Sequence, residues 1–258
     1  MRVVLLGERI SYSASPAMQA AAFRAAGLDW TYELVDVPAA GLPAAVEVLR
    51  HEGWAGANVT IPHKVAVMAL LDRVEAEAAD AGAVNTIRRE DRRLVGSNTD
   101  VAGIRAALRE VGVEPGRDLE VLVLGAGGSA RAAALALRGA KLTFVARRPG
   151  AGALPGTILD WAGEAWPGLA RRCDLLINAT PLGRHGEVAV AEDRMPRAGA
   201  VIDLVYQAGG TPLTAAAAAA GLRVADGWTV LLAQGAAAFE SWTGLPAPLD
   251  AMRGALPA

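Results

Sequence analysis

The chain has 258 residues, of which 53% are hydrophobic and 20% charged, and its formal net charge is −2. This composition supplies a substantial buried core and lacks the long basic runs typical of proteins that bind nucleic acid or anionic membranes. Cys173 is the only cysteine, so no disulfide within the chain and no cysteine metal cluster can form, which favours a reducing compartment. The three histidines lie far apart without ligand spacing, so we expect no metal site.

No segment of the sequence provides the ~20 consecutive apolar residues that a membrane-spanning helix needs. The apolar run in residues 1–7 is too short for a signal peptide and instead predicts a first strand. We therefore expect a soluble cytoplasmic protein, a monomer or homodimer, whose partner is a small-molecule substrate rather than nucleic acid or a membrane.

In the first hundred residues, strand-like and helix-like patterns alternate. The predicted strands cover residues 3–6, 31–37, 56–60, 83–88 and 94–97, and the last two flank a polar turn at 90–93. The predicted helices cover residues 15–26, with Pro16 in the first turn, 43–52 and 64–71.

The second half begins with a long amphipathic helix predicted over residues 99–111, which residues 112–116 break. Strands are then predicted from 121, over 141–145, 173–178 and 200–205, the alanine run 215–220 predicts a helix, and a last apolar helix covers 229–242. This alternation predicts an α/β protein with a mostly parallel sheet in each half and a ligand crevice between the halves.

Residues 121–132 carry the strongest functional signal: four apolar residues, then Gly-Ala-Gly-Gly-Ser-Ala, then an alanine-rich helix. In such a strand–turn–helix, Gly125 permits the tight turn, Gly127 lets the backbone approach a pyrophosphate, and Ala130 lets the helix pack closely on the strand. The helix start presents free N–H groups to phosphates. We therefore predict a dinucleotide-binding turn that consists of Gly125, Ala126, Gly127, Gly128, Ser129 and Ala130.

The end of the next predicted strand indicates which dinucleotide binds. An NAD-binding unit places Asp or Glu here for the ribose hydroxyls, but this chain has Arg147 and Arg148. A guanidinium can bind a 2′-phosphate through two hydrogen bonds, whereas a carboxylate would repel it. The sequence favours NADP over NAD; the alternative is an ordinary solvated basic loop.

Hydroxyl and amide side chains gather after the strands of the first half. Ser13 and Ser15 flank the start of a helix, where a structural N-cap is the alternative reading. Thr60 and Lys64 follow a strand, and a lysine at the start of a helix opposes the helix dipole, which suggests a functional role. Further along the chain, Asn85 follows the segment 82–84, and the helix from residue 99 opens on Asn98, Thr99 and Asp100, which capping alone could explain.

In the second half, Asn178 and Thr180 follow one strand, and Asp203, Leu204 and Tyr206 end the next. Ligands of open α/β sheets bind at the carboxyl ends of strands, so these positions are candidates too. Gln234 lies on the last apolar helix, either exposed or aimed into a site.

Taken in order, these segments resemble the shikimate dehydrogenase family over nearly the whole chain. The motifs are Ser-x-Ser-Pro, Asn-Val-Thr-Ile-Pro-His-Lys, Gly-Ala-Val-Asn-Thr, Gly-x-Asn-Thr-Asp, Gly-Ala-Gly-Gly-Ser-Ala, Asn-Ala-Thr-Pro-Leu-Gly, Asp-Leu-Val-Tyr and a late glutamine helix. The resemblance implies NADPH-dependent reduction of 3-dehydroshikimate to shikimate, in aromatic amino-acid biosynthesis. It also implies a substrate domain of residues 1–100, completed by helices in about 226–258, and a Rossmann-type NADP-binding domain over 101–225.

Roles follow from the resemblance position by position. It implies that Lys64 and Asp100 form the catalytic pair and also contact substrate. Ser13 and Ser15 would hold the substrate carboxylate, with Tyr206 near it, while Thr60, Asn85 and Gln234 would bind the substrate by hydrogen bonds. On the cofactor side it implies the glycine turn, a 2′-phosphate site at Arg147 with Arg148, and further contacts from Thr180, Leu204 and Gly227, the last near the nicotinamide.

Two rival functions remain open at this point. A quinate or quinate/shikimate dehydrogenase would share these motifs and differ mainly in pocket residues and cofactor choice. A non-catalytic NADP-binding sensor could retain the glycine turn, but Lys64 and Asp100 are both present, which favours an enzyme.

Overall fold

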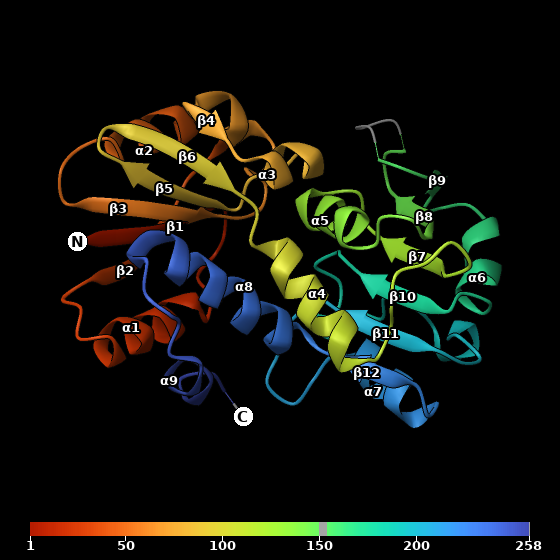
Figure 1. The fold of residues 1–258 in the computed structure, drawn as a ribbon. Coiled ribbons are helices and arrows are strands. Elements are labelled where there is room, and N and C mark those ends of the chain that lie inside the picture. Colours follow the sequence, from red (N-terminus) through yellow and green to blue (C-terminus); the bar gives the residue numbers. More distant parts are fainter. Residues whose placement is uncertain (150–153, 258) are drawn as a thin grey trace. The chain divides into compact units, whose positions relative to one another are not determined.

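The computed structural model describes residues 1–149 and 154–257, which form two compact units. The first unit consists of Met1–Asp100 and Leu232–Pro257, and the second of Val101–Leu231 (Figure 1). The chain passes from one unit to the other within α4 (Asp100–Glu110) and returns within α8 (Gly227–Thr243). Both ends of the described chain therefore belong to the first unit.

The first unit is built on a six-stranded sheet with the order β2-β1-β3-β5-β6-β4. β1 pairs in parallel with β2 and β3, and β4 with β6, whereas β5 is antiparallel to β3 and β6. The antiparallel pair β5–β6 is the hairpin predicted around the polar turn. The strands are β1 (Arg2–Gly7), β2 (Thr31–Asp36), β3 (Trp54–Val59), β4 (Arg73–Val74), β5 (Thr86–Glu90) and β6 (Arg93–Ser97).

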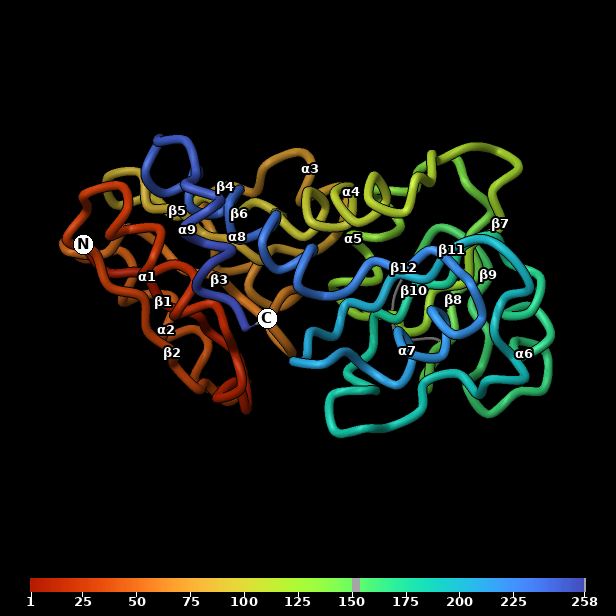
Figure 2. Tube along the Cα trace, turned by 90° about the horizontal axis from the view of Figure 1, so that it is seen from below, coloured from red at the N-terminus to blue at the C-terminus, as the bar shows by residue number. Residues whose placement is uncertain are grey.

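Helices cover both faces of this sheet. α2 (Leu42–Val48), α3 (Ala76–Ala81) and the 3-10 helices η1 (Ala39–Gly41) and η2 (Ala66–Leu70) lie on one side, where the apolar side chains of α2, η2 and α3 join those of the strands in one core (Figure 1). On the other side, α1 (Ser15–Ala25) packs against α9 (Leu249–Gly254), so the last helix of the chain lies beside the first (Figure 2). Phe23 of α1 also contacts Phe239 of α8, with 5.8 Å between ring centroids.

The second unit has a six-stranded sheet with the order β12-β11-β10-β7-β8-β9, and each neighbouring pair is parallel. This is the strand order of the doubly wound dinucleotide-binding fold. From β7 the chain adds β8 and β9 on one side of the sheet and then β10, β11 and β12 on the other, so the strand order reverses between β7 and β10. The strands are β7 (Glu120–Leu124), β8 (Lys141–Ala146), β9 (Thr157–Asp160), β10 (Leu175–Asn178), β11 (Ala200–Asp203) and β12 (Arg223–Ala225). The prediction of two parallel-rich α/β sheets is confirmed.

Side chains of β7 alternate between two cores. Val121 and Val123 pack with α4 and α5 (Gly128–Ala136), while Leu122 and Leu124 pack with α6 (Ala165–Ala170) and α7 (Pro212–Ala219). Because both faces are covered by helices, the strand is continuously apolar, as its sequence indicated. A short 3-10 helix, η3 (Glu192–Arg194), precedes β11.

Some predicted elements have different bounds. The helix predicted over 43–52 ends at Val48, because the next N–H groups bond three residues back, to Val46 and Glu47, and tighten the chain into a turn. The strand predicted over 83–88 begins only at Thr86, because the Val84 N–H donates to the carbonyl of Lys64, outside the sheet. None of the helices in the described residues is long and apolar enough to span a membrane.

Candidate functional site

The first unit contains a buried ion pair between two predicted site residues. The Nζ of Lys64 donates to Oδ2 of Asp100 at 2.5 Å, and each side chain is only 11% exposed. Asp100 is the first residue of α4, and its backbone N–H donates to Oδ1 of Asn98 at 3.1 Å. The carboxylate thus stands at a helix start, where a negative charge is favoured, and faces a cation.

The sequence predicted Lys64 at the start of a helix, but the structure does not place it there. It lies in a turn before η2, and within η2 the Met68 N–H bonds the carbonyl three residues back, that of Val65. An α-helix from Lys64 would need the Lys64 carbonyl for Met68, but that carbonyl accepts from the Val84 N–H at 2.8 Å instead. The dipole argument for Lys64 is therefore wrong, and the contact with Asp100 replaces it.

Asn85 connects this pair to the late helix. Its Oδ1 accepts from the Thr99 N–H at 2.7 Å, and its Nδ2 donates to Oδ1 of Asp100 at 2.8 Å. A peptide N–H can only donate, so the amide orientation of Asn85 is fixed. Nδ2 of Asn85 and Oγ1 of Thr99 both lie 3.5 Å from Oε1 of Gln234, which is itself buried. The structure thus brings Lys64, Asn85, Asp100 and Gln234 into one network.

Further members of the network, Thr99, Thr86 and Asn58, were not among the predicted site residues. Thr99 bonds Asn85 through its backbone and hydroxyl. Asn58, at the end of β3, accepts from the Tyr32 hydroxyl at 2.8 Å and donates at 3.0 Å to Oγ1 of Thr86, the residue after Asn85. The available signal was position. Asn58 lies near the end of a strand, two residues before Thr60, and Thr99 adjoins Asp100, where capping was a sufficient local explanation.

Ser13, Ser15 and Thr60 also belong to the first unit. Ser15 is buried, and its N–H donates to Oγ of Ser13 at 3.3 Å, while the N-cap position of α1 is Ala14, without a side-chain bond. The capping explanation for the serines therefore does not describe α1. Thr60 is half-buried and directly follows β3. Its N–H donates to the Leu6 carbonyl at 2.9 Å.

In the second unit, the glycine turn lies where the strand order reverses. Gly125 has φ 110°, and a Cβ there would lie 2.9 Å from the carbonyl oxygen of Ala179 and 3.3 Å from Cγ2 of Thr180. The end of β7 and the loop after β10 are thus in direct contact. At Gly127, the N-cap of α5, a Cβ would meet none of the described atoms within 4 Å, so the backbone faces open space. This is the geometry a pyrophosphate needs at a helix start.

The remaining residues predicted to bind the cofactor lie just after the ends of neighbouring strands. Arg147 and Arg148 follow β8, directly beside β7, and both are exposed. Oγ1 of Thr180 donates to Oδ1 of Asn178 at 2.7 Å, and the Leu204 N–H donates to the Asn178 carbonyl at 3.0 Å. Because all these strands are parallel, the residues lie at one edge of the sheet, with Ser129, Ala126, Gly128 and Ala130 in the turn and first helical residues after β7.

Asp203 ties the loops at this edge together. Its Oδ1 accepts from Nδ2 of Asn178 at 2.8 Å and from the Val205 N–H at 3.0 Å, and its Oδ2 accepts from Oγ1 of Thr211 at 2.6 Å. Burial raises the pKa of the Asp203 carboxyl above its usual range, against the effect of these donors, and the charge of Asp226 adds to the rise.

Tyr206 and Gly227 meet in the same unit. A Cβ on Gly227 would lie 2.5 Å from the backbone nitrogen of Tyr206, so only glycine fits at this start of α8. The Tyr206 ring packs on Trp228, with 4.9 Å between ring centroids.

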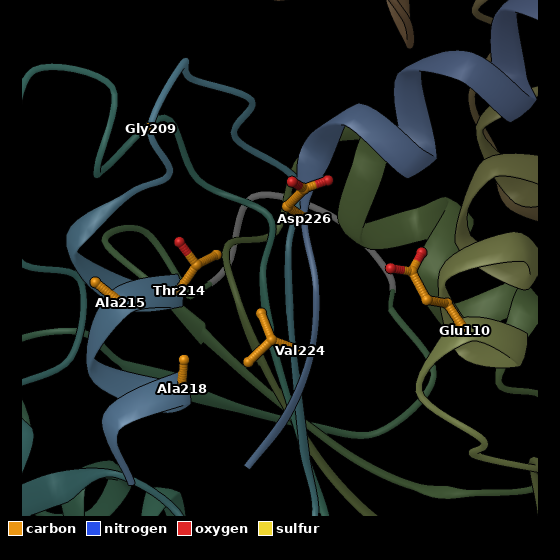
Figure 3. Close-up of a pocket in the computed structure, with 7 residues that line it drawn as sticks. All are labelled: Glu110, Gly209, Thr214, Ala215, Ala218, Val224 and Asp226. Atoms are coloured by element: carbon orange, nitrogen blue, oxygen red, sulfur yellow. The ribbon is translucent and has the colours of Figure 1, made fainter. Parts of the chain in front are cut away.

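A separate pocket of about 270 Å³ lies between α4, α7 and β12, where the Glu110 and Asp226 carboxylates face it with Thr214 and small residues (Figure 3). Two carboxylates would repel phosphate, and none of its lining residues is a predicted site residue, so we do not assign the cofactor to it. Cys173 is a buried free cysteine whose pKa burial raises to about 12, which makes it a poor nucleophile. No group of three or more potential metal-ligating side chains occurs in residues 1–149 and 154–257.

Comparison with known proteins identifies the family. The model for the shikimate dehydrogenase substrate binding domain matches residues 5–87, and that for the shikimate 5'-dehydrogenase C-terminal domain matches residues 227–256. The chain is 43% identical to the shikimate dehydrogenase (NADP(+)) of Anaeromyxobacter sp. (strain Fw109-5), over 98% of this chain and 95% of that protein.

Solved structures agree with the sequence comparison. The crystal structure of shikimate 5-dehydrogenase from Thermus thermophilus in complex with NADP(H) and shikimate superposes with a TM-score of 0.85 at 37% identity, covering 99% of this chain and 98% of that one. That of the Listeria monocytogenes enzyme in complex with shikimate and NAD gives a TM-score of 0.82 at 29% identity, covering 98% and 95%. With identity above 40% to a curated relative over nearly its full length, this chain belongs to the shikimate dehydrogenase family.

Proposed function

We propose that this protein is an NADP-dependent shikimate dehydrogenase, which reduces 3-dehydroshikimate to shikimate reversibly with NADPH. The observation that carries the proposal is the buried Lys64–Asp100 pair, bonded through Asn85 to Thr99. A stability role alone explains such a pair poorly, because desolvation offsets most of the attraction in a buried ion pair.

The side chains around the pair suit a polyhydroxylated ring acid. Such a substrate needs several neutral donors and acceptors, and Asn85 and Gln234 provide amides while Thr60 provides a hydroxyl. We assign Ser13 and Ser15 to the substrate carboxylate, together with Tyr206. These assignments follow the family resemblance.

The second unit has the features that NADP requires. Open backbone at Gly127 suits the pyrophosphate, and the exposed guanidinium groups of Arg147 and Arg148 suit the 2′-phosphate. Thr180, Leu204 and Gly227 are assigned to the remainder of the cofactor by the same resemblance. When bound, NADPH supplies the hydride that reduces the ketone.

Lys64 and Asp100 would manage the charge that this reduction creates. Ketone reduction develops an alkoxide, which the Lys64 ammonium can stabilise and protonate. Asp100 keeps the ammonium in place and can orient the substrate hydroxyl. In the reverse direction, the neutral Lys64 amine would accept the hydroxyl proton.

A spectrophotometric assay tests the proposal. Purified protein should form NADPH from shikimate and NADP⁺, with lower kcat/KM for quinate and for NAD⁺. Faster oxidation of quinate would identify a quinate dehydrogenase instead. Tight NADPH binding without turnover of either acid would identify a sensor.

The proposed setting of the enzyme is the cytoplasm, as a monomer or homodimer. Cys173, a buried free cysteine of the kind common in reducing compartments, supports this location. Sedimentation analysis of the purified protein would give the oligomeric state.

A further inference from the structure

The residue before Lys64 makes a buried contact that the proposed chemistry does not use. His63 is 1% exposed, and its Nε2 lies 2.6 Å from the carbonyl oxygen of Val37. A carbonyl oxygen carries no proton, so Nε2 must hold one and donate it. An apolar side chain at position 63 could fill the same space, so the presence of a hydrogen-bond donor there calls for an explanation.

The Val37 carbonyl is a firm anchor. Val37 directly follows β2, and its own N–H donates to the Gly7 carbonyl at the end of β1, at 2.7 Å. The His63 ring therefore fastens the turn that carries Lys64 to the ends of two paired parallel strands. Within the turn, the His63 N–H donates to the Thr60 carbonyl at 2.8 Å.

The other side of the turn is fastened by Lys64 itself, whose carbonyl accepts from the Val84 N–H at 2.8 Å. The next residue, Asn85, donates to Asp100. The backbone of Lys64 is thus held between two parts of the unit. This matters because a lysine side chain has four rotatable bonds, so the position of its ammonium depends on how firmly its backbone is placed.

We propose that His63 is a positioning residue for Lys64, and that its Nε2–H···O=C bond to Val37 sets where the ammonium meets Asp100. His63 itself does not touch the substrate. The inference rests on the proposed function, since it names a residue that the same site needs. Misplacement of a catalytic group by about 1 Å can reduce a rate by on the order of 100-fold.

The experiment compares His63→Met with His63→Gln. Methionine fills the space without a donor, whereas the Nε2 of glutamine is as many bonds from Cβ as that of histidine and can still donate to Val37. We expect His63→Met to lower kcat roughly 10- to 100-fold with little change in the KM for NADP⁺, and His63→Gln to restore most of the loss. His51→Met, the same change at an exposed histidine, should leave kcat unchanged.

A second readout needs no turnover. Acetic anhydride labelling of Lys64, quantified by mass spectrometry of its peptide, should be slow in the wild type and in His63→Gln and severalfold faster in His63→Met. Labelling of exposed Lys141 should be equal in all of them. If His63→Met does not fold, His63→Asn, whose amide is too short to reach Val37, replaces it in both measurements.

Wild-type kcat and labelling in the donor-less variant would overturn the inference, as would equal losses in His63→Met and His63→Gln. Absence of shikimate oxidation in the wild type would instead overturn the proposed function, while the labelling comparison would still decide the role of His63.

Discussion

The Lys64 ammonium and the Asp100 carboxylate are separated by 36 residues in the sequence and by 2.5 Å in the structure. Asn85 lies between them in the chain and donates to the same carboxylate at 2.8 Å. The three residues come from a turn, a loop and a helix start, and no two of these elements are neighbours in the chain. The two side chains therefore meet only because the sheet of the first unit brings these elements together.

Replacement of Lys64 tests whether it acts in chemistry or only in binding. Lys64→Ala should lower kcat by roughly 10²- to 10⁴-fold, the usual range for a lost general acid, with a much smaller change in the KM for shikimate. Steady-state kinetics with NADP⁺ measure both. The chain's one other lysine, the exposed Lys141, provides the control Lys141→Ala, which should behave as the wild type. An effect confined to KM would show that Lys64 only binds substrate.

Replacement of Arg147 tests the choice between NADP and NAD. Arg147→Ala should weaken NADPH binding about 10- to 100-fold, the size of one or two hydrogen bonds to a charged group, and leave NADH binding unchanged. Fluorescence titration with each nucleotide measures the two affinities. Arg117→Ala, at an exposed arginine before β7, should change neither. Equal wild-type affinities for NADPH and NADH, unaffected by Arg147→Ala, would refute the phosphate site.

Two glycines of the cofactor turn should respond differently to alanine. At Gly127 the backbone is in an ordinary extended conformation and a Cβ meets open space, so Gly127→Ala should change stability by at most about 1 kcal/mol but weaken NADPH binding by blocking the pyrophosphate. At Gly125, φ of 110° and the nearby Ala179 carbonyl oxygen should make alanine cost about 1–3 kcal/mol.

Denaturant unfolding and nucleotide titration of both variants separate these effects. Full NADPH affinity in Gly127→Ala would show that the phosphates lie elsewhere.

The buried Asp203 carboxyl should leave a signature in the pH dependence of stability. Its pKa is raised in the folded state, so its stabilising contribution is complete below the unfolded pKa and is lost as the pH rises through the folded value. Asp203→Asn cannot ionise, so the wild type should lose stability relative to this variant as the pH rises from about 4, the unfolded pKa of Asp.

Urea unfolding of the wild type and of Asp203→Asn, at a series of pH values from about 4 upward, measures the difference in their free energies of unfolding. Asp250→Asn, at a fully exposed aspartate, should show no such trend. A difference between wild type and Asp203→Asn that does not vary with pH would contradict the raised pKa.

The sequence by itself determined the features that are local in the chain. Continuous apolar runs such as 121–124 predict strands covered on both faces, and the run of glycines at 125–128 predicts a turn into a helix, because backbone freedom and side-chain periodicity act over a few residues. The motif order also determined the family.

Only the tertiary structure decided what surrounds Lys64. The helix predicted from Lys64 fails because the Lys64 carbonyl accepts from the Val84 N–H. The role of Thr99 could not be separated from capping until its backbone N–H and hydroxyl were seen to bond Asn85. Oε1 of Gln234 lies within 3.5 Å of Nδ2 of Asn85 across 149 residues of chain. Such contacts depend on strand order and on which buried donor finds which acceptor, and these are properties of the whole fold that no short segment encodes.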